Sequence, residues 1–145
     1  MEPLDLSTRP PRSPRAQLDG MLVLARTIDK WRAALPGGTS GEYPPGGLSG
    51  MFLSFFEISP QELLDVVAAV QADEDVVRWF RERTGLTDEL RAAWNEEAEG
   101  HVVTDANRAY VYKTYPIAAR NPQMTNLLDV LEADDLECFP NMKIS

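Results

Sequence analysis

The longest helical pattern in the chain is the stretch SPRAQLDGMLVLARTIDKWRAAL, residues 13–35. It opens with Ser13-Pro14, a hydroxyl that can cap a free amide followed by the residue best suited to the first helical position. It stops before Pro36-Gly37-Gly38. Apolar side chains recur along it at spacings of three, four and seven residues: Leu18, Met21, Ala25, Ile28 and Leu35. This periodicity predicts a helix over 13–35 that packs into the core.

Charged residues fall on the apolar face of this predicted helix. Asp29 and Arg32 each follow an apolar residue of that face by four positions. Burying an ionised carboxylate without partners costs several kcal/mol. Three explanations are therefore open for Asp29: a buried ion pair that ties the helix to a neighbour, a polar site on the core side of the helix, or a charge at the solvated rim. Arg26 and Arg32 stand three residues away on either side of it.

Working outward, the remaining segments also indicate helices. Residues 1–12 predict an extended arm, and Pro36–Gly50 predicts a loop, because six of its fifteen residues are glycine and three are proline. Helices are expected over 48–58, 59–71, 73–84, 87–99, 104–115 and 125–134, with a connector at 116–122 and a tail at 136–145. A strand remains an alternative within 104–115, because Tyr110-Val111-Tyr112 favours β-structure. The expected architecture is one all-α domain over 1–145, a bundle of about five to six helices.

Composition excludes several classes of function. The chain has 145 residues and a net charge of −9, of which residues 44–145 carry −10 and residues 1–43 carry +1. This acidity disfavours nucleic-acid binding. No apolar run is long enough for a signal peptide or a membrane span, so we expect a cytoplasmic protein without a membrane partner. One cysteine, Cys138, and one histidine, His101, exclude an internal disulfide and a multi-histidine metal centre. We expect no metal and no cofactor.

Two short motifs carry groups able to bind a ligand. Ser13 and Arg15 at the start of the predicted helix could hold an anion, although pairing of Arg15 with the acidic body is the simpler expectation. Within the glycine-rich loop, Gly41-Glu42-Tyr43 offers a carboxylate and a phenol. The competing interpretation is that Tyr43 anchors the loop on the core and that Glu42 pairs with an arginine of the first helix.

A resemblance to a known family rests on residues from most of the chain. They are Ser13-Pro14, Leu18-x-Gly20, Leu24-Ala25-Arg26-x-Ile28-Asp29-Lys30-x-Arg32-Ala33, Gly41-Glu42-Tyr43, Phe55-Phe56-x-Ile58, Trp94-Asn95-Glu96 and Thr125-x-x-x-Asp129. This pattern resembles the bacterial family catalogued as domain of unknown function 5069. The resemblance implies a small cytoplasmic bacterial helical domain and supplies no catalytic residues. The segments that carry the resemblance include the residues singled out above, on the apolar face of the predicted helix and in the glycine-rich loop.

Two functions of different classes follow from these observations. The first is a non-enzymatic protein-interaction or regulatory module, because no recognisable catalytic set is present. The second is a binding protein or enzyme for a small anionic metabolite. Its candidate ligand-binding residues are Arg26, Asp29, Lys30, Arg32, Glu42 and Tyr43. An open pocket lined by Asp29 and Arg32 beneath the Gly41–Tyr43 loop would favour the second function. Full burial of both residues, paired with each other or with Glu42 and with no cavity beside them, would exclude it. The sequence leaves the oligomeric state open.

Overall fold

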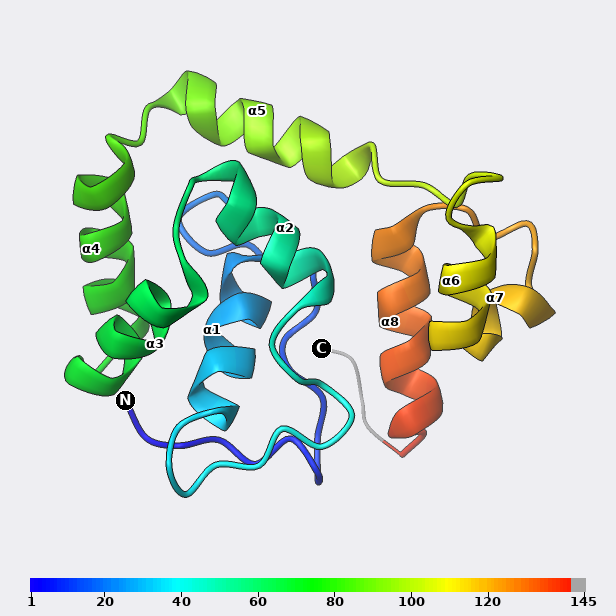
Figure 1. The fold of residues 1–145 in the computed structure, drawn as a ribbon, viewed down its shortest axis with the longest axis horizontal. Coiled ribbons are helices and arrows are strands. Elements are labelled where there is room, and N and C mark those ends of the chain that lie inside the picture. Colours follow the sequence, from blue (N-terminus) through cyan, green and yellow to red (C-terminus); the bar gives the residue numbers. More distant parts are fainter. Residues whose placement is uncertain (142–145) are drawn as a thin grey trace.

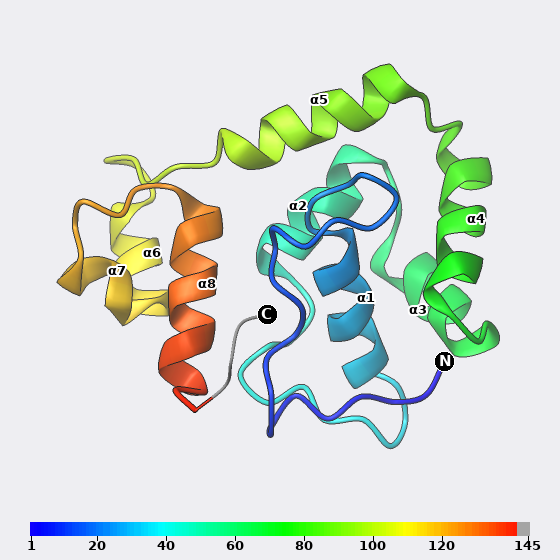
Figure 2. The same cartoon turned by 180° about the vertical axis from the view of Figure 1, so that it is seen from behind.

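Helix α1 (Leu24–Ala33) lies in the middle of the computed structural model, which describes residues 1–141 (Figure 1, Figure 2). Around it lie α2 (Gly47–Phe55), α3 (Pro60–Ala69) and α4 (Asp73–Thr84). Helix α5 (Asp88–Glu99) leads across the molecule to a second group, α6 (Arg108–Thr114), α7 (Pro116–Arg120) and α8 (Leu127–Cys138) (Figure 1). The all-α class is confirmed. Residues 1–141 contain eight helices and no strand, more than the five to six expected.

The core is built from aromatic rings that α2, α4 and α5 contribute. The ring of Phe52 lies 5.1 Å from that of Trp94 and 5.5 Å from that of Phe80, measured between centroids. All three side chains are fully buried. The Trp94 indole N–H donates to the backbone oxygen of Leu22 at 2.8 Å, which satisfies its one donor. These contacts fix α5 across the segment that precedes α1.

The helix predicted over 13–35 is shorter than expected, because α1 begins at Leu24. Residues 13–23 form turns in which Asp19 has φ 54° and Val23 has φ 75°, values that a helix does not allow. Two residues of α5 hold this irregular backbone. Asn95 accepts a hydrogen bond from the Leu22 amide at 3.0 Å, and Trp94 binds the Leu22 carbonyl. Ser13 therefore caps a turn, and no helix begins at this residue.

Several further boundaries differ from expectation. The segment 104–115 is helical, but only from Arg108, and the predicted connector 116–122 contains the short helix α7. Helix α8 begins after Asn126, whose side chain accepts from the Leu128 amide at 2.8 Å, and it extends to Cys138. The first part of the predicted tail is thus helical, and residues 142–145 lie outside the described residues. None of the helices within 1–141 has the length and apolar character that crossing a membrane requires.

The arm at residues 1–12 contains a turn and a bend between residues 6 and 9 and lies along the loop after α1. Leu6 donates its amide to the carbonyl of Thr39 at 2.8 Å, and Thr39 donates to Leu4 at 3.1 Å. Leu4 and Leu6 are buried against Ala33 and Tyr43. The arm therefore forms one wall of the molecule beside α1 (Figure 2).

The capping box predicted at Ser59 is present and gives a first testable effect. The Ser59 hydroxyl accepts from the Glu62 amide at 3.1 Å, and Glu62 accepts from the Ser59 amide at 2.8 Å. The Ser59→Ala substitution should lower the free energy of unfolding by about 1 kcal/mol in urea denaturation. The matched Ser54→Ala change, at an exposed position of α2, should stay within about 0.5 kcal/mol. Equal effects of the two substitutions would contradict a role for the cap.

Candidate functional site

Helix α1 is buried on almost every side, and its buried residues include three ionisable groups. Nine of its ten residues are buried, among them Arg26, Asp29 and Lys30. The arm covers one side of the helix, the loop after α1 covers another, and α8 lies across from it (Figure 1, Figure 2). A buried charge without a partner is strongly destabilising, so the partners of these three groups determine how this face of α1 is stabilised.

Asp29 forms an ion pair with the arm. Its carboxylate accepts from the backbone amide of Arg12 at 2.8 Å and from the Arg12 guanidinium at 3.1 Å. The same guanidinium reaches Asp73 in the first turn of α4 at 2.9 Å. Of the three explanations for Asp29, the structure therefore shows the ion pair, and its partner is Arg12 rather than Arg26 or Arg32.

Arg26 forms the second ion pair, with Asp135 of α8. Two parallel contacts of 2.8 and 3.1 Å join the guanidinium to the carboxylate. Both side chains are buried, and the guanidinium also lies over the ring of Tyr43, 5.5 Å from its centroid. The bidentate geometry is the strongest form of this interaction. The pair joins α1, α8 and the glycine-rich loop at one point.

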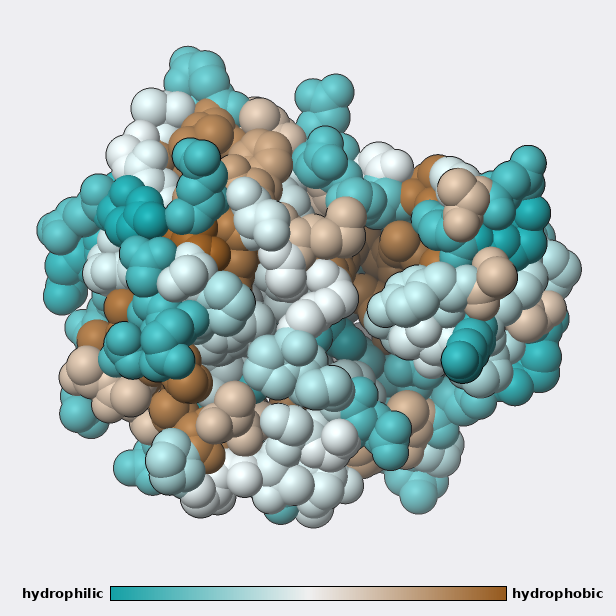
Figure 3. Space-filling view, viewed as in Figure 1, coloured by the Kyte–Doolittle hydropathy of each residue, from teal (hydrophilic) through white to brown (hydrophobic). Residues whose placement is uncertain are grey.

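Two pockets open on either side of this ion pair. The first, here called the arm pocket, has a volume of about 530 Å³ and is lined by the arm, by Asp29 and Arg32, and by Glu132, Asp135 and Phe139. The second, here called the loop pocket, has a volume of about 360 Å³. Its lining residues include Arg26, Lys30, Glu42, Tyr43, Gly46, Tyr115, Asp134 and Cys138. Figure 3 shows the surface hollowed between the two groups of helices. Both volumes lie within the range typical of small-molecule sites.

The comparison with protein families covers most of the chain. A family model described as Domain of unknown function (DUF5069) matches residues 8–137. The chain belongs to this family. No curated protein matches this chain with significant similarity. The span that matches the DUF5069 model includes Arg9, Arg32 and Asp135 of the arm pocket and Lys30 of the loop pocket, whereas Leu4, Cys138 and Phe139 lie outside it.

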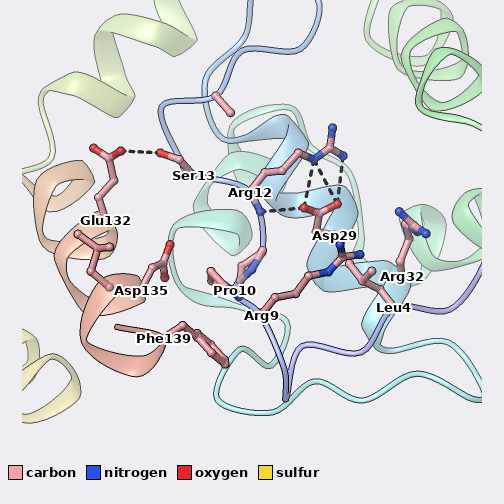
Figure 4. A pocket seen from close by; sticks show the side chains of 13 residues that line it. Leu4, Arg9, Pro10, Arg12, Ser13, Asp29, Arg32, Glu132, Asp135 and Phe139 are labelled. Atoms are coloured by element: carbon pink, nitrogen blue, oxygen red, sulfur yellow. Dashed lines mark hydrogen bonds and ion pairs between the residues drawn. The ribbon is translucent and has the colours of Figure 1, made fainter. Parts of the chain in front are cut away.

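In the DUF5069 chain, the arm pocket contains two arginines without carboxylate partners. Nine of the eleven arginines form ion pairs, and within residues 1–141 only Arg9 and Arg32 form none. Both line the arm pocket, together with Leu4 and Pro10 of the arm and with Phe139 on the α8 side (Figure 4). Its carboxylates are each engaged, Asp29 by Arg12, Glu132 by Arg15 and Asp135 by Arg26.

The loop pocket holds three groups whose pKa values differ from their ordinary values. Burial and the neighbouring Arg26 lower the pKa of Lys30 to about 8. Partial burial and the charge of Asp135 raise the pKa of Asp134 to about 6. Burial also raises the pKa of Tyr43, whose hydroxyl has no hydrogen-bond partner among the described residues. Such shifts gather more often in functional sites than elsewhere.

The structure places the predicted ligand-binding residues in two pockets rather than one. Asp29 and Arg32 face the arm pocket, and Arg26, Lys30, Glu42 and Tyr43 line the loop pocket. Tyr43 is buried and stacks on Phe139, as expected of an anchor, whereas Glu42 is exposed and forms no ion pair with an arginine of α1. The proposed anion site at Ser13 and Arg15 loses its basis, because no helix begins there and Arg15 pairs with Glu99, Asp129 and Glu132.

Several residues of both pockets carry only weak signals in the sequence. Arg9 belongs to a segment without periodicity, and Asp134 and Asp135 lie in an acidic stretch that is typical of a solvated helix face. Tyr115 belongs to the segment 104–115, which the sequence leaves open between helix and strand. One signal was available for Asp135: it follows Leu128 and Leu131 by seven and four positions, which places it on the apolar face of α8.

Proposed function

We propose that this protein binds a small organic anion with an apolar body in the arm pocket. The supporting observation is the position of Arg9 and Arg32. In a chain with a net charge of −9, the two described arginines without ion pairs line the same pocket. A carboxylate or phosphate group would supply the counter-charge that these two arginines lack within residues 1–141, and guanidinium groups bind both in bidentate geometry.

The apolar part of the ligand is suggested by the remaining walls. Leu4, Pro10, Leu136 and Phe139 line the pocket beside the arginines. Pockets that hold small molecules combine predominantly apolar walls with a few polar groups that fix orientation. A purely inorganic anion would leave these walls in contact with water, whereas an alkyl or aryl group would cover them. The ligand class is therefore an amphipathic carboxylate or phosphate.

A binding function is favoured over catalysis in this pocket because its described carboxylates are held in ion pairs. A carboxylate held by a guanidinium is a poor general base, since its partner stabilises the ionised form. The protein-interaction module expected from the sequence has narrower support. Among residues 1–141, two of the four exposed large hydrophobic side chains, Tyr110 and Leu136, line the two pockets and so belong to the proposed ligand-binding surface.

The test is a thermal-shift screen with octanoate, phenylacetate and octyl phosphate, beside acetate and inorganic phosphate as anions without an apolar body. A ligand at about a hundred times its dissociation constant adds about 2.7 kcal/mol to stability, a rise of about 5–10 °C in Tm for a domain of this size. At least one amphipathic anion should produce such a rise, and acetate and phosphate should not. If none of the three stabilises the protein, the proposal fails.

Matched double variants locate the bound anion. Arg9→Gln with Arg32→Gln removes both guanidinium groups of the arm pocket and should weaken binding about 10- to 100-fold in calorimetric titration. Arg78→Gln with Arg108→Gln removes the same charge from exposed positions whose ion pairs lie within one helical turn. This control should keep the affinity within about twofold. Equal loss in both variants would show a general effect of charge and would contradict a site at Arg9 and Arg32.

A further inference from the structure

The amine of Lys30 is buried in the loop pocket with a single hydrogen-bond partner. Lys30 is 8% exposed, and its Nζ donates a hydrogen bond to the carbonyl of Gly46 at 2.9 Å. It forms no ion pair with a carboxylate anywhere in residues 1–141. The nearby cation Arg26 is neutralised by Asp135, so that carboxylate is already engaged. An ammonium group in such a place lacks the counter-charge that burial requires.

The same pocket contains a second polar group without a partner. Tyr43 is 5% exposed, and its hydroxyl is buried without a hydrogen bond among the described residues. Buried polar atoms in native structures are nearly always paired, and those that are not call for an explanation. Lys30 and Tyr43 both line the loop pocket, so a small molecule held there lies beside the amine of Lys30.

We propose that Lys30 is a nucleophilic amine that condenses with a small aldehyde or ketone held in the loop pocket. Lysines that are desolvated or placed next to another cation are those that form Schiff bases with carbonyl substrates. Lys30 meets both conditions, because it is buried and has Arg26 one helical turn before it. This activity belongs to a different pocket from the anion binding proposed above, and either proposal can fail its test without the other.

The condensation balances without any external oxidant or reductant. The lone pair of Nζ attacks the carbonyl carbon and the C–N bond forms. The oxygen then gains a proton and the nitrogen loses one, which gives a neutral carbinolamine. The hydroxyl group is protonated and leaves as water while the nitrogen lone pair forms the C=N bond, and the nitrogen then releases its second proton to give the imine. Asp134, which lines the pocket and has a pKa raised to about 6, supplies and recovers the proton of the dehydration step.

The shifted pKa of Lys30 agrees with this role. Burial and Arg26 lower it to about 8, so a useful fraction of the amine is neutral near physiological pH. The neutral fraction of an amine rises about tenfold for each unit by which its pKa falls. Carboxyl and phenol groups line the loop pocket from the loop after α1, from α6 and the residue that follows it, and from α8: Glu42, Tyr43, Tyr110, Tyr115 and Asp134. The charge of Asp135 also acts on the amine.

Reductive trapping tests the proposal in the intact chain. The protein is treated with propanal and cyanoborohydride near neutral pH, and the alkylated residues are quantified by peptide mass spectrometry. The exposed Lys113 is an internal reference within the same molecule. The adduct should form at Lys30 at least about tenfold faster than at Lys113. In urea, where the pocket is lost, the two rates should become equal. Equal rates in the folded protein, or no adduct at Lys30, would overturn the proposal.

A matched pair of variants tests the part played by Asp134. Asp134→Asn keeps the shape of the pocket and removes the acid, and it should slow adduct formation at Lys30 about three- to tenfold. Asp129→Asn makes the same change on an exposed position of α8 and should leave the rate unchanged. Slowing by both substitutions would assign the effect to net charge and would remove Asp134 from the mechanism.

Discussion

The Asp135→Ala substitution should lower the free energy of unfolding by about 3–5 kcal/mol, because it leaves the guanidinium of Arg26 buried without its carboxylate. Arg26 is 3% exposed, and its remaining contacts are the carbonyl of Arg12 at 3.3 Å and the ring of Tyr43. Neither neutralises its charge. Urea denaturation monitored by circular dichroism measures the loss, which for a domain of ordinary stability approaches half of the total.

Two controls separate the buried charge from a general effect of the substitution. Asp129→Ala removes a carboxylate from the same helix, where its side chain is 52% exposed and pairs with Arg15, and it should cost less than about 1 kcal/mol. Combining Arg26→Met with Asp135→Leu removes both charges and should cost less than Asp135→Ala alone. If the single substitution costs less than 1 kcal/mol, the pair is not a structural tie between α1 and α8.

The second large effect is expected at Trp94. The Trp94→Ala substitution should cost about 3–5 kcal/mol, since the indole is fully buried and its removal leaves a cavity against Phe52 and Phe56. The variant also loses the bond to the Leu22 carbonyl, which holds the irregular segment before α1. Calorimetry should show a Tm lower by about 6–15 °C.

Two further substitutions divide this effect into its parts. Trp94→Phe keeps most of the ring volume but loses the donor to Leu22, and it should cost about 1–3 kcal/mol. Tyr110→Ala removes an aromatic ring that is 65% exposed and should stay within about 0.5 kcal/mol. A loss at Tyr110 as large as that at Trp94 would mean that the core lies elsewhere than the structure places it.

Helix boundaries that depend on neighbouring residues were predictable from the sequence. Ser59 and Thr87 cap α3 and α5 through side chains that bind amides three residues later. Gly85 ends α4 with a φ of 63°, a conformation that glycine adopts without strain. Such signals act within one turn of backbone, so the local sequence contains all the information that they need.

The start of α1 could not be predicted because its cause lies far away in the chain. Val23 adopts φ 75°, which is unfavourable for a β-branched residue, and the adjacent Leu22 is held by Trp94 and Asn95. These partners follow it by 72 and 73 residues. Local propensity favours a longer helix, and tertiary hydrogen bonds override it.

The candidate site was predictable in the same partial way. The sequence indicates a site at Asp29 and Arg32, because charged residues on an apolar helix face need partners or a pocket. The partners themselves were not predictable, because Arg12 lies in the aperiodic arm and Asp135 follows Arg26 by 109 residues. The division into two pockets depends on how α8 packs against α1, which no spacing along the chain encodes.

The ion pair between Arg26 and Asp135 also separates the two pockets. Asp135 lines the arm pocket and Arg26 lines the loop pocket, so one interaction forms a wall common to both. An anion bound by Arg9 and Arg32, as proposed, would repel Asp135 and weaken its hold on Arg26, which would alter the electrostatic field at Lys30. Occupancy of either pocket is thus expected to change the affinity of the other. Thermodynamic linkage requires the two effects to be equal in size.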